Sequence, residues 1–224
     1  MNTSPQQNRD KRSCNEILSS VQGKISMIKQ MLNGLKNGPV PLKTTNFTNL
    51  LIWSRIVINE IENLKSCDRK KFDEWYSTYK KELFGEEDAS PDPLLDYFIQ
   101  ARNQLEHQGI VKVGWSIKVH HLSIPGDLLK YGPAPPGARG VFLGDQLGGI
   151  GWLVDLPDKG QAKYYVNLPK EFVESSLLPH NPPSTHLGEN VKSDSAEDLA
   201  EHYVNYLDKM IQSAAKVFQA SKAP

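Results

Sequence analysis

The spacing of apolar residues changes twice along this chain, and the change limits its fold more than any other feature of the sequence. Up to residue 107, apolar side chains recur every three or four positions, which is the repeat of an amphipathic helix. From about 110 to 170 they alternate with polar ones, which is the repeat of a β-strand. The helical repeat then returns near the end of the chain. We therefore expect a helical bundle with a small antiparallel β structure inserted before its last helix.

The helical repeat predicts five helices, which are expected at about 15–35, 45–65, 68–84, 93–107 and 195–220. The last of them carries one long apolar stripe, which a helix of this length can bury only against other helices. The predicted fold class is therefore mainly α, an up-and-down bundle of four to five helices with a β insertion. The predicted domain organisation is a disordered N-terminus at 1–12, a helical bundle at 13–109 and 193–221, a β-rich insertion at 110–178 and a linker at 179–192.

Composition narrows the class of protein. Residues 1–84 carry 14 basic against 8 acidic side chains, whereas residues 85–224 carry 12 against 18, so that the chain as a whole is neutral. The neutral total gives no general argument for nucleic-acid binding, although the basic N-terminal part offers phosphates a local patch. No run of about 18 apolar residues is present, so we expect no association with a membrane.

The two cysteines and the N-terminus predict where the protein works. Cys14 and Cys67 are far apart in the sequence and lack the CxxC spacing of metal and redox sites, so we interpret them as free thiols. Free thiols are typical of the reducing cytoplasm. The polar N-terminus has no apolar segment of the kind that a secretory signal needs. These observations predict a cytoplasmic protein.

One segment of the sequence, DYFIQARNQLEHQG at 96–109, combines a packing pattern with reactive polar residues. Leu94, Phe98, Ala101 and Leu105 share one helix face, which predicts the buried side of the fourth helix. Arg102, Asn103 and His107 lie on other faces near the end of that helix. An ordinary explanation exists, because Arg102 can pair with Glu106 one turn later and His107 can cap the C-terminus of the helix.

These residue types also suit the cleavage of an RNA phosphodiester without metal. Histidine takes or gives a proton near neutral pH, and arginine binds the oxygens of a phosphate bidentately. Arg102 and His107 are five positions apart, which separates their directions by about 140° on an ideal helix. They can meet at one phosphate only if the helix loosens near Gly109 or if a second subunit completes the site.

The stretch RNQLEH at 102–107 resembles the R-x4–6-H signature of the HEPN superfamily, which contains many helical, metal-independent ribonucleases. The aromatic pair Tyr97-Phe98 just upstream fits the same resemblance. It implies that Arg102 and His107 are catalytic, that Asn103 supports them with Glu106 alongside, and that no cofactor is needed. It further implies a homodimer with a composite site, RNA as the substrate, and a toxin or defence role with an antitoxin or regulatory partner.

A non-catalytic helical module that binds a nucleotide or a partner protein remains the alternative. The β insertion follows directly on the histidine, and it can act either as a lid that selects substrates or as a block. Other motifs are weaker. His120, His121, His180 and His186 are interpreted as surface histidines without a metal, and the glycines of GDQLGGIGW at 144–152 as turn residues.

Overall fold

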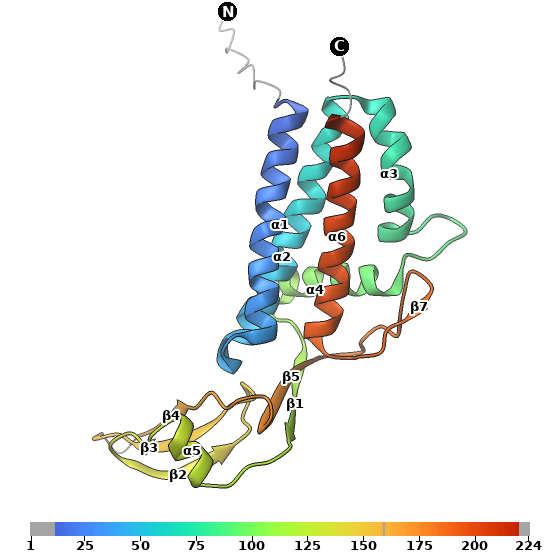
Figure 1. Ribbon diagram of the computed structural model, residues 1–224. Coiled ribbons are helices and arrows are strands. Elements are labelled where there is room, and N and C mark those ends of the chain that lie inside the picture. The colour runs from blue at the N-terminus through green and yellow to red at the C-terminus, as the bar shows by residue number, and fades with distance from the viewer. Residues whose placement is uncertain (1–11, 159, 220–224) are drawn as a thin grey trace, which may run out of the picture.

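The computed structural model describes residues 12–158 and 160–219 (Figure 1). The predicted disordered segment at 1–12 lies outside the described residues except for Arg12. The helices and 3-10 turns are α1 (Cys14–Asn37), η1 (Val40–Leu42), α2 (Lys43–Ile61), η2 (Glu62–Ser66), α3 (Arg69–Phe84), α4 (Pro93–Gln108), α5 (Gly126–Tyr131) and α6 (Ala196–Gln219). The strands are β1 (Val113–Val119), β2 (Ala138–Leu143), β3 (Ile150–Asp155), β4 (Gln161–Tyr165), β5 (Val173–Pro179), β6 (Thr185–His186) and β7 (Glu189–Asn190).

The structure confirms the mainly helical fold with antiparallel strands before the last helix. All five predicted helices are present, and α5 is a short additional helix that the apolar pattern did not reveal. Local sequence explains where helices begin. Ser13 and Glu16 form a capping box at the start of α1, in which each side chain bonds the backbone N–H of the other residue. Within the described residues, no helix is long and apolar enough to cross a membrane.

The helices α1, α2 and α6 lie side by side, with α3 next to them, and α4 runs across their lower ends (Figure 1). This direction of α4 departs from the predicted up-and-down arrangement. Phe98 of α4 supplies the physical reason, since its ring packs against two helices at once. Its centroid lies 4.2 Å from that of Tyr203 of α6 and 6.1 Å from that of Phe47 of α2. These two contacts hold α4 against both α2 and α6 in the observed direction.

The two-stranded ribbon β1–β5 connects the rest of the β segment to the helices (Figure 1). A three-stranded antiparallel sheet in the order β2-β3-β4 covers a second, smaller core. In β5, Val173 belongs to that smaller core and Leu177 to the helical core. The ribbon therefore connects the two cores directly.

A buried ion pair fixes the ribbon to the helices. Lys43, the first residue of α2, donates to Glu197 of α6 and to the carbonyl oxygen of Ser175 in β5 at 2.8 Å. Glu197 also accepts the N–H of Leu177 at 3.2 Å. Lys43 and Glu197 are 6% and 8% exposed, so each charge depends on its partner for compensation. One contact set thus holds α2, α6 and β5 together.

A carboxylate organises the loop between β2 and β3. Asp145 accepts the N–H groups of Leu147 and Gly149 at 2.9 and 3.1 Å, and it also accepts from Lys163 Nζ at 2.8 Å and the Tyr165 hydroxyl at 2.6 Å. Burial raises the pKa of Asp145, but the hydrogen bonds from Lys163, Tyr165 and the two backbone groups outweigh it and lower the pKa to about 2. The ionised form is therefore the one that the fold stabilises.

We expect this carboxylate to make the protein sensitive to acid. Because the folded pKa of Asp145 lies below the unfolded value of about 3.9, its stabilising contribution is complete above pH 5 and is lost as the pH falls toward 2. Asp145→Asn should therefore lower the free energy of unfolding at pH 7 and flatten its decline between pH 5 and pH 2, measured by urea denaturation. Asp155→Asn, which removes a pair with exposed Arg139, is the matched control. An unchanged decline in Asp145→Asn would contradict this role.

Residues 179–192, assigned to a linker from the sequence, contain the short hairpin β6–β7. Its turn consists of Leu187 and Gly188, both with positive φ, of 48° and 83°. This is the left-handed backbone of a two-residue hairpin turn, which glycine adopts freely. The hairpin is anchored by Asp92, the residue before α4, which accepts the N–H of Leu187 and contacts the His186 ring.

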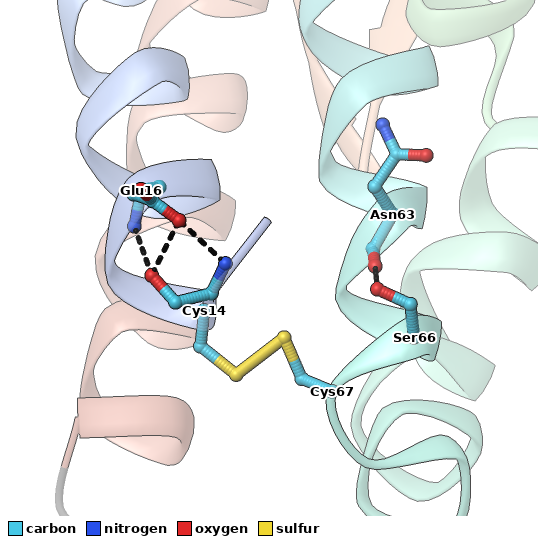
Figure 2. The surroundings of a disulfide bond; sticks show 6 residues. Cys14, Glu16, Asn63, Ser66 and Cys67 are labelled. Carbon is cyan, nitrogen blue, oxygen red and sulfur yellow. Dashed lines mark hydrogen bonds between the residues drawn. A yellow bond between two sulfur atoms is a disulfide. The ribbon is translucent and has the colours of Figure 1, made fainter. Parts of the chain in front are cut away.

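The interpretation of the cysteines as free thiols was wrong, because the structure joins Cys14 and Cys67 in a disulfide (Figure 2). The two helices α1 and α2 run in opposite directions, so the start of α1 and the end of η2 lie at the same end of the bundle (Figure 1). The Cα atoms of Cys14 and Cys67 are 5.9 Å apart, a distance that a disulfide can span. The two cysteines have a sequence separation of 53, so no local pattern indicated that they are close in space.

Candidate functional site

The helix α4 carries the RNQLEH segment without interruption. Asp92 caps its N-terminus by accepting the N–H of Leu95 at 3.0 Å, and Pro93 occupies its first turn. The helix continues to Gln108 and ends at Gly109, whose φ of 71° is left-handed. It therefore does not loosen before His107. The divergence of about 140° between Arg102 and His107 remains in the folded chain.

The buried face of α4 ends before the motif. Leu94, Leu95, Phe98 and Ala101 are buried, as predicted for all of them except Leu95, which the pattern missed. Leu105, which was predicted to be buried, is only half-buried. The last turns of α4 thus extend beyond the core that holds its first half. Polar side chains there can reach solvent without any loss of packing.

Arg102 is held by two neighbours on its own helix. Its Nη1 donates to Asn103 Oδ1 at 3.1 Å, and its Nη2 donates to Glu106 Oε1 at 2.7 Å. The second Glu106 oxygen also lies against Nη1, so the contact is bidentate. The side chains of Arg102 and Glu106 are 24% and 52% exposed. A phosphate that binds Arg102 through the same two nitrogens must therefore displace the Glu106 carboxylate.

His107 is exposed and makes no side-chain hydrogen bond to any described residue. It lies in the last turn of α4, where its side chain can reach solvent. The structure brings Arg102, Asn103 and Glu106 into contact with one another, and it leaves His107 apart from them.

A groove begins just beyond the motif, where the chain leaves α4 for the ribbon. Its volume is about 490 Å³, and it is lined by residues 111–114 and 178–180. Lys112 and His180 are among these residues, and their backbones are hydrogen-bonded to each other at 3.2 Å. The groove thus lies next to the end of α4 and carries one lysine and one histidine.

Sequence reasoning missed one polar cluster. His186 was interpreted as a surface histidine, but its side chain is only 13% exposed and its Nδ1 lies 3.0 Å from Asp92 Oδ1. The two residues are 94 positions apart, and neither belongs to a motif, so no pattern in the sequence signals the pair. Among the described residues, no group of three histidine, cysteine or carboxylate side chains is placed to hold a metal ion.

Comparisons with protein-family models, with curated proteins and with solved structures find no match to this chain.

Proposed function

We propose that the protein is a metal-independent endoribonuclease of the HEPN type, with a site formed by Arg102, Asn103 and His107. One observation supports it most. Arg102 and His107 both reach solvent at the end of a helix whose first half is buried, so a ligand can approach their side chains. We further propose that it acts as a toxin or defence effector held in check by an antitoxin or regulatory partner. Both roles rest on the resemblance of RNQLEH to the family signature.

The proposed chemistry uses each residue type for what it does best. His107 takes the proton of the 2′-hydroxyl or protonates the leaving 5′-oxygen. Arg102 exchanges Glu106 for the phosphate and neutralises the charge that grows on its oxygens. Asn103, bonded to Arg102, orients the guanidinium. The 2′-oxygen bonds to phosphorus as the bond to the 5′-oxygen breaks, which leaves a 2′,3′-cyclic phosphate and a 5′-hydroxyl.

We propose that the protein acts as a homodimer, and the helix geometry supports this part of the proposal. Because α4 stays helical through Gln108, Arg102 and His107 of one chain point in different directions. A second copy placed with its α4 against the first can present its His107 to the phosphate bound at Arg102. Incubating the purified protein with RNA in excess chelator tests the activity, and product ends with 2′,3′-cyclic phosphate and 5′-hydroxyl are expected. If the RNA remains intact for every sequence and fold supplied, the proposal is wrong.

The alternative is a binding module without catalytic activity. The bidentate pair between Arg102 and Glu106 favours it, since an arginine already paired is a common structural feature of helices. In that case the same surface would bind a nucleotide or a partner protein and leave it unchanged. Retained binding together with an absence of cleavage would identify this alternative.

A further inference from the structure

A second candidate site lies near the N-terminal end of α4, where Asp92 contacts the hairpin β6–β7. A cavity of about 320 Å³ opens between the hairpin β6–β7 and the helix α6. Its walls include His186, Glu189, His202, Asn205, Tyr206 and Lys209. The cavity thus gathers two histidines and a lysine that no motif connects in the sequence.

His186 is oriented as a base. Its Nδ1 lies 3.0 Å from Oδ1 of Asp92, a carboxylate that is 9% exposed and also bonded to the N–H of Leu95 and Leu187. A carboxylate can accept a hydrogen bond from Nδ1 when that nitrogen carries the proton, and in that tautomer the lone pair lies on Nε2. Nε2 makes no hydrogen bond to any described residue. Every fully buried side-chain nitrogen among these residues has a hydrogen-bond partner, so Nε2 is not fully buried. Nε2 must therefore reach solvent, which the cavity supplies.

A second histidine and a cation face the same space from α6. The rings of His202 and His186 are 6.1 Å apart between centroids, and the His202 side chain is exposed. Lys209 lies seven positions after His202, which places both on the same face of the helix. Tyr206 stands between them, with its ring 5.9 Å from that of His186 and its hydroxyl donating to Glu82 at 2.7 Å. The bond to Glu82 fixes the wall against which the two histidines lie.

The lining selects a class of reaction. Among the described residues that line the cavity there is no serine, threonine or cysteine, and the hydroxyl of Tyr206 is engaged by Glu82, so no free hydroxyl or thiol is placed there to form a covalent intermediate. A base, an acid and a cation are what direct displacement at phosphorus by water requires. Glu189, on the hairpin, partly offsets the charge of Lys209. Because these two charges nearly cancel, the cavity should bind a singly charged phosphodiester better than a doubly charged phosphomonoester. The phosphomonoester product can therefore leave the cavity.

We propose that this cavity is an acid–base site that hydrolyses small phosphodiesters, with ribonucleoside 2′,3′-cyclic phosphates as its substrates. His186 Nε2 takes a proton from water as the water oxygen bonds to phosphorus. The bond from phosphorus to the 2′-oxygen breaks, and that oxygen takes the proton of His202, giving a 3′-phosphate and a free 2′-hydroxyl. Lys209 binds a non-bridging oxygen, and Asp92 is a positioning residue. The choice of substrates rests on the proposed function, because the proposed RNA cleavage leaves ends of this chemistry, whereas the acid–base pair rests on the geometry of the cavity.

The experiment supplies the substrate directly. The full-length protein is incubated in excess chelator with each of the four ribonucleoside 2′,3′-cyclic phosphates and, separately, with dinucleoside monophosphates, and products are followed by phosphorus NMR. His186→Asn keeps an N–H for Asp92 but removes the base. It should lower hydrolysis by at least roughly 100-fold, the usual contribution of general base catalysis. His202→Ala should lose the high-pH side of a bell-shaped profile, because the acid is removed while the base remains.

Matched controls test whether the loss is specific to this site. His120→Ala and His121→Ala each remove an exposed histidine outside both sites, and both should leave hydrolysis unchanged. Hydrolysis that is lost in His186→Asn and retained in these two variants supports the proposal even if RNA is never cut. Cleavage of the dinucleotides alone would overturn the assignment to cyclic substrates. The site itself is excluded if no phosphodiester is hydrolysed, or if His186→Asn is as active as the wild type.

Discussion

Arg102→Ala and His107→Ala should each lower RNA cleavage by at least roughly 100-fold, in chelator and at equal protein concentration. Without the guanidinium, no cation neutralises the negative charge that grows on the phosphate oxygens. Without the imidazole, no side chain carries the proton to or from the reacting oxygen. Both side chains are at least partly exposed, and neither supports the core. The variants should therefore keep the thermal midpoint of the wild type within a few degrees, so that lost cleavage reports lost chemistry.

The matched control for this result is Glu106→Gln. The amide keeps a hydrogen bond to Arg102 but gives up the charge that competes with phosphate for the guanidinium. We expect cleavage to be retained or raised, with a lower Michaelis constant for RNA. Cleavage that survives in either alanine variant, or cleavage that stops with chelator alone, would remove Arg102 and His107 from the mechanism.

Reducing the Cys14–Cys67 disulfide should be the largest single change to stability. The bond closes a loop with a sequence separation of 53 residues. Opening a loop of this length returns conformational entropy to the unfolded chain worth about 4 kcal/mol at 25 °C. The free energy of unfolding, measured by urea denaturation with and without reductant, should fall by an amount of that order. Figure 2 shows the bond that ties the first turn of α1 to the end of η2.

Cysteine variants provide the control for this measurement. Cys14→Ser and Cys67→Ser should each be as unstable as the reduced wild type, and reductant should have no further effect on either. If reductant leaves the unfolding of the wild type unchanged, the disulfide does not stabilise the fold. The same experiment bears on location, because disulfides persist mainly outside the reducing cytoplasm. The argument for a cytoplasmic protein from free thiols no longer holds, and that location stays a prediction.

Local patterns in the sequence were enough to predict most of the helices. The apolar repeat identified α4, and the alternating run from about residue 110 identified the β segment. Helices and strands of this kind depend on residues within a few positions of one another, so the apolar spacing in the sequence is enough to predict them.

Contacts between distant segments were not predictable in this way. The disulfide and the contact of His186 with Asp92 join residues that share no motif. The direction of α4 depends on Phe98 meeting two helices, and the apolar stripe that contains Phe98 would look the same in a parallel arrangement. For the candidate site, the sequence predicted which residues lie at the end of α4, but only the fold shows that Glu106 holds Arg102 while His107 stands free.

The central claim is a site shared by two chains, and mixing two inactive variants tests it directly. In a composite site, Arg102→Ala and His107→Ala chains that exchange freely give mixed dimers with one intact site of two. Since half of the dimers are mixed, about one quarter of the wild-type cleavage should return in a symmetric dimer with two equivalent sites. Neither variant alone should show this activity. If the mixture stays as inactive as its components while mass measurements show mixed dimers, Arg102 and His107 do not act across the two chains.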